Sequence, residues 1–198
     1  TIASGALNVG DEVTVLPSGK SAAVSRILTM DGDLERAAAG QAISLLLSGE
    51  IDVSRGDIIV SSDARPEIAD QFAAHIVWMS EQRLVPGRQY ILQSSTMAVI
   101  AQVTEIKHKV NVNTLEKNPA KHLELNDVAL CNIAVDRAIP FDAYADNRET
   151  GSFILVDRSN NATIGCGMID FALRRAANIH RQVMEVGKVE RAALNKQK

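Results

Sequence analysis

The sequence predicts an all-β protein made of two consecutive small β-barrels and a helical C-terminal linker. The first observation is that short runs of alternating or fully apolar residues, rich in β-branched types, recur between Gly, Asp, Asn and Pro. The second is one interruption of this series at residues 63–70, where Pro66 and several charged residues predict a linker between domains. The third is that the β pattern ends at about residue 170.

The first barrel is expected over residues 1–62. Its predicted strands lie in DEVTVLP, SAAVSRILTM, AISLLL and GDIIVSS. In the first of these strands, Val13 and Val15 would share one face and Thr14 would lie on the other, because side chains alternate along a strand. The predicted strands follow one another closely, so they form a compact group that ends near Ser62.

Two segments between these strands have other patterns. SGALNVGDEV, residues 4–13, is predicted to be a turn in which Gly5 and Gly10 supply backbone freedom and bind no ligand. LERAAAGQ, residues 34–41, contains Glu, Arg and Ala, which favour helix by propensity. The neighbouring strands leave little room, so we expect a turn or a single helical turn there.

The second barrel is expected over residues 71–173. Its predicted strands lie in QFAAHIVWMS, RQYILQSS, TMAVIAQVTEIKHKV, DVALCNIAVDRAIPF, GSFILVDR and ATIGCGMID. Six strands suit a small closed barrel. The tail, residues 174–198, is rich in Ala, Arg, Lys and Glu, which predicts a helical connector broken at Gly187.

The charge of the chain sets limits on its partners. The 21 Lys and Arg residues against 24 Asp and Glu give a net charge of −3, which provides no global attraction to nucleic acid or to an anionic membrane. No apolar run approaches the roughly 20 residues that span a bilayer, and no segment resembles a signal peptide. We therefore expect a cytoplasmic protein with no membrane contact, for which nucleic acid is an unlikely partner.

The residue types that carry catalysis or bind metals do not converge in the sequence. Cys131 and Cys166 stand in apolar, strand-like segments, where a thiol is usually a small buried hydrophobic group. The histidines are scattered and lack the spacing of a zinc site. They are His75, His108, His122 and His180. We predict no catalytic, cofactor-binding or metal-binding residue in this chain.

Three short motifs resemble known binding loops and fail on spacing or context. Residues 18–21, Ser-Gly-Lys-Ser, end like a phosphate-binding loop, but Thr14 stands where that loop needs its first glycine, and the motif joins two strands. Residues 31–33, Asp-Gly-Asp, start like a calcium loop, yet Arg36 replaces the required glycine. Residues 165–167, Gly-Cys-Gly, have no helix after them, so we expect them to permit close packing within a barrel.

The segment from Lys107 to His122 is the one local basic patch of note. It holds four lysines and two histidines against one glutamate. It has no aromatic residue for base stacking and no arginine, so specific RNA recognition is poorly supported. We expect an exposed loop, with contact to a protein or a phosphate group as the alternative.

A group of motifs gives the sequence a specific resemblance. The motifs are Ile2-Ala3-Ser4-Gly5, Leu7, Val9 to Val13, Ala39-Gly40-Gln41 and Arg55 to Ile59. Together they resemble the second domain of translational GTPases such as elongation factor Tu, and the later barrel is similar to the third domain of that family. VWMSEQRLVPGRQYIL, the extended loop around residues 106–130, and DNRETGSFILVDRSNNATIGCGMI resemble the large GTPase subunit of bacterial sulfate adenylyltransferase.

This resemblance implies a function for the parent protein. The parent would use GTP hydrolysis to favour adenylyl transfer from ATP to sulfate, giving adenosine 5′-phosphosulfate and pyrophosphate. GTP and magnesium would bind an N-terminal GTPase domain before Thr1, and a small catalytic subunit would be the partner. The tail resembles a connector, which implies an adenylylsulfate kinase domain after Lys198. The two barrels would then be non-catalytic and inactive by themselves.

Two expectations follow from this resemblance. The chain opens without Met, inside an apolar β-prone run, so the opening strand of the first barrel would be missing. We therefore expect an open first domain or an edge-to-edge homodimer, since unpaired strand edges pair readily. The alternative to the sulfate-activating function is the barrel pair of a translation factor that binds tRNA or the ribosome, for which stronger basic stripes are expected.

Overall fold

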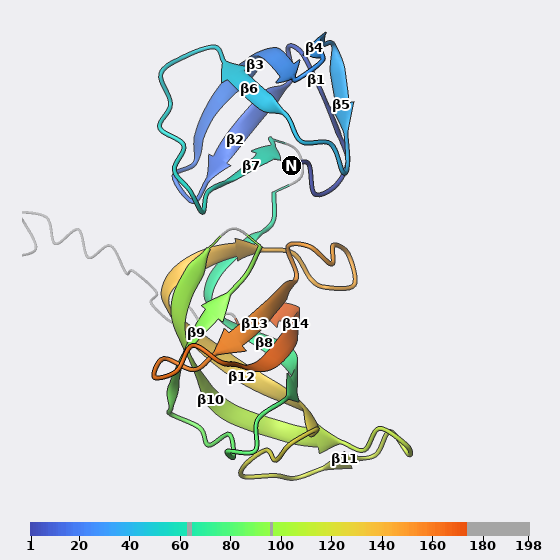
Figure 1. Cartoon of the computed structure of the whole chain (residues 1–198), viewed down its shortest axis with the longest axis vertical. Coiled ribbons are helices and arrows are strands. Elements are labelled where there is room, and N and C mark those ends of the chain that lie inside the picture. The colour runs from blue at the N-terminus through green and yellow to red at the C-terminus, as the bar shows by residue number, and fades with distance from the viewer. Residues whose placement is uncertain (63–64, 96, 174–198) are drawn as a thin grey trace, which may run out of the picture.

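The computed structural model describes residues 1–62, 65–95 and 97–173. Every named element in this part of the chain is a β-strand, as predicted, and the strands form two units joined near residue 65 (Figure 1). No helix of the described part is long and apolar enough to cross a membrane. The predicted helical connector, residues 174–198, lies outside the described residues.

The N-terminal unit is an open, curled sheet that we call the half-barrel. Its strands are β1 (Ala6–Asn8), β2 (Glu12–Leu16), β3 (Lys20–Thr29), β4 (Gly32–Leu34), β5 (Arg36–Ala38), β6 (Ser44–Leu47) and β7 (Ile58–Ser61). The main sheet has the order β4-β3-β2-β7, β6 pairs with the other edge of β3, and β1 pairs with β5. Within the described residues this sheet does not close, in line with the expectation of an open first domain.

The core of the half-barrel is small. Its buried members are Val13, Val24, Ile27 and Ala37, with partly buried residues such as Ile59 packed against them. Val13 and Val15 are buried as predicted, but Thr14 between them is also buried. The Thr14 hydroxyl lies 2.9 Å from the hydroxyl of Ser21 and 3.2 Å from that of Ser62, so its polar group is satisfied inside the sheet.

Three predictions at the segment level need correction. Residues 34–41 form no helical turn, because Leu34 ends β4 and the following residues form β5, which pairs with β1. Ala37 is buried opposite Leu7, and this tertiary pairing overrides helix propensity. The stretch 4–13 likewise contains the short strand β1 before its turn.

The third correction concerns the expected linker, residues 63–70. Strand β8 (Glu67–Trp78) begins inside it, since Ile68 pairs with Pro140 and Ala69 pairs with Ile139 on β12. The charged residues that suggested a linker are compatible with a strand whose outer face meets solvent. The connection between the two units is therefore shorter than the predicted linker, because β8 already begins at Glu67.

The C-terminal unit is a closed barrel. Its strands are β8, β9 (Gln89–Gln93), β10 (Ala98–Val110), β11 (Lys117–Asn118), β12 (Val128–Phe141), β13 (Ser152–Val156) and β14 (Thr163–Ala172). The ring order is β10-β12-β8-β14-β13-β9, and β9 pairs back with β10. These are the six predicted strands, all antiparallel to their neighbours, which confirms the closed second barrel.

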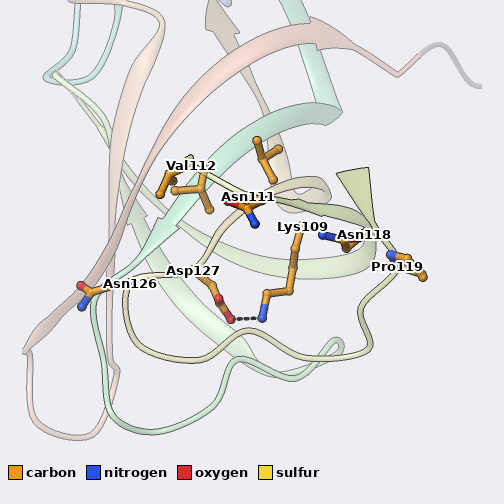
Figure 2. A pocket seen from close by; sticks show the side chains of 9 residues that line it. Lys109, Asn111, Val112, Asn118, Pro119, Asn126 and Asp127 are labelled. Carbon is orange, nitrogen blue, oxygen red and sulfur yellow. Dashed lines mark ion pairs between the residues drawn. The ribbon is translucent and has the colours of Figure 1, made fainter. Parts of the chain in front are cut away.

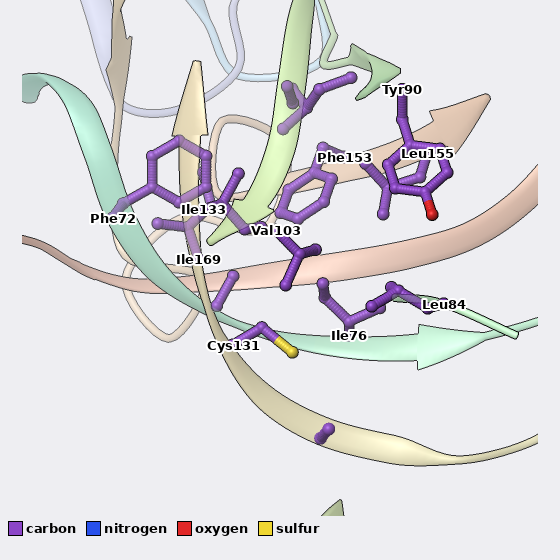
Figure 3. Close-up of a cluster of buried hydrophobic side chains, with 14 of the residues drawn as sticks. Phe72, Ile76, Leu84, Tyr90, Val103, Cys131, Ile133, Phe153, Leu155 and Ile169 are labelled. Carbon is purple, nitrogen blue, oxygen red and sulfur yellow. The ribbon is translucent and has the colours of Figure 1, made fainter. Parts of the chain in front are cut away.

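Aliphatic side chains and several aromatic rings fill the barrel interior (Figure 3). The ring centroid of Phe72 lies 5.2 Å from that of Phe141 and 6.1 Å from that of Phe153. A Cβ atom added at Gly167 would lie 2.1 Å from the Phe153 ring, so only glycine allows this ring to approach β14. The predicted close packing around residues 165–167 is confirmed.

Candidate interaction surface

The structure places the rejected binding motifs in turns and strands. Gly19 lies in the hairpin between β2 and β3, where its N–H donates to the carbonyl of Val15 at 2.7 Å. Residues 31–33 lie at the tight hairpin between β3 and β4, and Asp33 forms an exposed ion pair with Arg26 at 2.6 Å. Both motifs serve as β-hairpin connections.

The cysteines and histidines also lie apart. Cys131 and Cys166 are free thiols, and burial raises the pKa of Cys131 to about 12, which keeps its thiol protonated and unreactive near neutral pH. His75 contacts Asp170 at 2.9 Å, and His122 contacts Glu124 at 3.6 Å. Across the described ranges, no three or more His, Cys, Asp or Glu side chains come together where they could hold a metal ion.

A polar cluster around the buried carboxylate of Asp157 lies where β9 meets the hairpin between β13 and β14. Arg88 donates to Asp157 at 2.5 Å and lies over the ring of Tyr90, 5.6 Å from its centroid. Hydrogen bonds from the side chain and backbone of Ser159, and then the Arg88 charge, hold the pKa of Asp157 below its usual value. The cluster connects the start of β9 to the β13–β14 hairpin, and the charge of Arg88 is paired with that of Asp157.

The segment from Lys107 to His122, which we call the basic arm, projects from the barrel (Figure 1). It contains the end of β10, a turn, and the two-residue strand β11, which pairs with β10 through Val110 and Lys117. The predicted exposed loop is therefore a β-hairpin over much of its length. Its position outside the closed ring leaves the turn available for contact.

Asn111 organises the turn at the tip of the basic arm. Its carbonyl accepts the N–H of Leu115 at 2.7 Å, and its side-chain oxygen accepts the N–H groups of Asn113 and Thr114 at 2.9 and 3.3 Å. The turn places Leu115 at a φ of 59°, in the left-handed region that a leucine rarely occupies. The backbone of the tip is therefore held in one conformation by its own hydrogen bonds.

This turn presents two apolar side chains to solvent. Val112 is 65% exposed and Leu115 is 73% exposed, and both stand on a tip whose backbone polar groups are bonded. The charge of this segment is evident in the sequence, whereas its apolar tip was not predicted. The available signal was Asn111 itself, since an asparagine side chain commonly bonds the backbone two residues ahead of it and fixes a turn.

A shallow pocket lies beside the tip (Figure 2). Its volume is about 400 Å³. It is lined by Lys109, Val110, Asn111, Val112, Asn118, Pro119, Asn126, Asp127 and Val128. Lys109 and Asp127 form an ion pair of 2.6 Å within this lining, so the pocket presents side-chain amides and apolar groups with no net charge.

The charges of the basic arm divide into paired and unpaired groups. Lys107 pairs with Glu105 at 2.6 Å, and Lys109 pairs with Asp127. Lys117 and Lys121 are exposed and form no ion pair with any described residue. Desolvation, and then the charges of Lys117 and His75, lower the pKa of His108. Among the charged groups of the arm without an ion pair to a described residue, Lys117 and Lys121 are positive and Glu116 is negative.

Two family models match the chain. The model described as elongation factor Tu domain 2 matches residues 1–60, and the model described as GTP-eEF1A C-terminal domain-like matches residues 71–170. The half-barrel and the closed barrel thus correspond to two domain types that both occur in elongation factors. A solved structure of sup35 complexed with GDP has a TM-score of 0.78 over 87% of this chain and 43% of its own, at 18% identity, and so shows the same fold.

Two curated relatives are much closer in sequence. The bifunctional enzyme NodQ of Rhizobium sp. (strain N33) is 52% identical over 198 residues, which is 100% of this chain and 31% of the relative. Sulfate adenylyltransferase subunit 1 of Aliivibrio fischeri (strain MJ11) is 47% identical over 169 residues, which is 85% of this chain and 35% of the relative. The chain therefore spans about a third of the length of these relatives.

Proposed function

We propose that this chain, which belongs to the family described as GTP-eEF1A C-terminal domain-like, is the non-catalytic barrel region of a sulfate adenylyltransferase GTPase subunit. The parent enzyme would convert ATP and sulfate to adenosine 5′-phosphosulfate and pyrophosphate, coupled to GTP hydrolysis. The observation that carries this proposal is the 52% identity to NodQ, which extends over both units and the basic arm. The likeness to sup35, at 18% identity, reaches only the fold.

The described residues suit a mechanical role. Among the described residues, no group of three or more His, Cys, Asp or Glu side chains could hold a metal ion, and burial raises the pKa of the Cys131 thiol to about 12. In GTPases of this kind, a β-barrel pair can change its orientation relative to the nucleotide domain when the γ-phosphate is lost. We propose that this chain transmits such a change between the N-terminal GTPase domain, which would bind GTP and magnesium, and the small catalytic subunit.

NodQ is named as a bifunctional enzyme. This name, together with the tail that resembles a connector, supports a second enzymatic domain in the parent, which we propose to be an adenylylsulfate kinase. We place the parent in the cytoplasm, where ATP and GTP are available. Within this proposal the chain by itself has no turnover and no cofactor of its own.

A competition experiment tests the proposed function. An excess of the purified chain is added to an intact two-subunit sulfate adenylyltransferase, and synthesis of adenosine 5′-phosphosulfate is followed with and without GTP. We expect the chain to lower GTP-stimulated synthesis by occupying the small subunit, and to show no turnover alone. If a saturating concentration of the purified chain causes no inhibition, the proposal is contradicted.

The alternative is the barrel pair of a translation factor. Its support is the shared fold with sup35 and the two unpaired lysines of the basic arm. Filter binding to tRNA over a range of salt concentrations separates the two functions, since phosphate contacts make binding strongly salt-dependent. Tight, salt-sensitive binding to tRNA would favour the alternative and count against a sulfate-activating role.

A further inference from the structure

We propose that the tip of the basic arm is a docking element that inserts Val112 and Leu115 into an apolar groove, rimmed by carboxylates, on the small catalytic subunit. This inference rests on the proposed function and names the surface through which that partner binds. Three observations carry it: the exposed apolar pair, the turn that fixes its geometry, and the two unpaired lysines behind it.

The turn lowers the entropy that a docking loop loses when it is ordered on binding. The N–H of Asn111 donates to the carbonyl of Glu116 at 2.9 Å, and Leu115 donates back to the carbonyl of Asn111. The hydroxyl of Thr114 donates to the Glu116 carboxylate at 3.1 Å. These bonds exist without a partner, so the tip is already shaped for insertion, and a preorganised loop binds with less ordering cost.

The charge of the arm indicates which charges its partner's groove should carry. Glu116 is the one carboxylate of the segment, and the hydrogen bond from Thr114 holds it within the turn while its negative charge remains. Lys117 and Lys121 outnumber this carboxylate, so the groups without ion pairs near the apolar tip carry a net positive charge. A groove with carboxylates at its rim complements this arrangement, because opposite charges around an apolar contact speed association and fix its register.

The pocket beside the tip places a recess next to the projecting side chains. Val112 lies at the tip and also lines the pocket with Pro119 and Asn118, so a partner that covers the tip covers the pocket mouth as well. A volume of about 400 Å³ accommodates apolar side chains of the partner, and the asparagine amides can bond its backbone. The surface thus offers a projection next to a recess, which is typical of a shape-specific protein interface.

The same observations disfavour other classes of partner. Between residues 107 and 122 there is no aromatic residue and no arginine, which nucleic-acid surfaces use for stacking and for bidentate phosphate contacts. Two apolar side chains and two unpaired lysines are too few for stable attachment to an anionic membrane, which takes a cluster of several basic residues. A folded protein partner fits the small, rigid tip best.

The test titrates the small catalytic subunit against three forms of the chain by calorimetry. The docking variant is V112T/L115N, which removes the apolar contact while asparagine tolerates the left-handed φ of residue 115. The control is M30T, because Met30 is a fully exposed apolar residue at the β3–β4 hairpin. We expect affinity to fall about 30-fold in the docking variant, as for an interface hot spot, and to stay within about twofold in the control.

A charge variant tests the rim. K117E/K121E is compared with K20E/R36E, which makes the same charge change on exposed residues of the half-barrel. We expect association with the small subunit to slow about tenfold at low salt in the arm variant only, and the difference to shrink at high salt. Unchanged thermal unfolding of V112T/L115N establishes that its fold is intact.

The outcomes separate this inference from the function on which it rests. If the unaltered chain does not bind the small subunit, both are overturned. If it binds and V112T/L115N binds equally well, the docking role is overturned and the proposed function stands. If the arm variants instead lose binding to tRNA or to vesicles of anionic lipid, while binding to the small subunit is unchanged, the partner class is wrong.

Discussion

The half-barrel and the closed barrel are built from the same kind of strand, yet they bury their residues very differently. In the closed barrel every strand of the ring has a neighbour on both edges, and the core includes five aromatic residues. In the half-barrel β6 and β7 each have one strand neighbour, and the buried hydrophobic side chains are all aliphatic. Closure therefore accompanies a larger and more aromatic core.

The two units are expected to differ in stability and to unfold separately. Hydrophobic stabilisation scales with the apolar area removed from water, so the closed barrel is expected to be the more stable unit. Few side-chain hydrogen bonds connect the two units: the amide of Asn147 donates to the hydroxyl of Ser4 at 3.3 Å, and Arg65, near the junction, donates to the hydroxyl of Thr14 at 3.4 Å. We expect two unfolding transitions, with the half-barrel unfolding at the lower denaturant concentration.

The largest expected effect comes from truncating the centre of the closed barrel. Phe72 is fully buried and contacts the rings of Phe141 and Phe153, so Phe72→Ala leaves a cavity. We expect a loss of about 3 to 5 kcal/mol in the free energy of unfolding of the second transition. Urea unfolding followed by circular dichroism measures it. If the first transition shifts equally, the two units are not independent.

A smaller effect is expected from crowding the same core. Gly167→Ala places a Cβ against the Phe153 ring, which must shift, so we expect the closed barrel to lose about 1 to 3 kcal/mol. The matched control is Gly49→Ala in the half-barrel, where no atom lies within 4 Å of the added Cβ. Thermal unfolding of the two variants compares them. A neutral result for Gly167→Ala would contradict the packing argument.

Much of this difference between the units was readable from the sequence. The ten predicted strand segments all contain strands of the structure, because each has β-branched alternation between turn residues. The short strands β1, β4, β5 and β11 were missed, since two or three residues carry no measurable periodicity. Their pairing depends on tertiary contacts, as Ala37 opposite Leu7 shows.

The candidate surface was predicted only in part. Its lysines, which mark an exposed and charged segment, are visible in the sequence. The pairing of Lys109 with Asp127 could not be predicted, because the two residues are brought together by strands β10 and β12. The exposure of Leu115 also ran against expectation, since an apolar residue in a β-rich chain is usually buried.

The units also differ in how they hold an ion pair, which gives a pH-dependent prediction. Asp157 in the closed barrel is 6% exposed, whereas Asp33 in the half-barrel forms a surface pair. The pKa of Asp157 is lowered from 3.8, so its stabilising contribution is present above pH 3.8 and is lost as pH falls through the lower folded value. We expect the second transition to weaken below about pH 4.

The variants D157N and D33N test this assignment. In D157N the acid sensitivity of the closed barrel should be reduced, with lower stability at pH 7, because the hydrogen bonds from Ser159 and the pair with Arg88 are weakened. D33N should change the half-barrel by at most about 1 kcal/mol, as is usual for exposed ion pairs. Urea titrations at pH 3, 4, 5 and 7 supply the comparison. Equal acid sensitivity in both variants would refute the role of Asp157.

The smallest expected effect is on self-association through the open edges of the half-barrel, which the closed ring of six strands lacks. Strand β6 pairs with β3 on one side, and among the described residues no strand covers its other edge. Such an edge can pair with a second copy of the chain, and we expect weak, concentration-dependent dimerisation.

Leu46 is 43% exposed on strand β6, so Leu46→Lys places a charge where two such edges would meet. Sedimentation equilibrium should show dimerisation weakened about tenfold in this variant and unchanged in Ile154→Lys on β13, a strand of the closed ring with both edges paired. A chain that stays monomeric at every concentration would show instead that the curl and short length of the edge strands already prevent pairing.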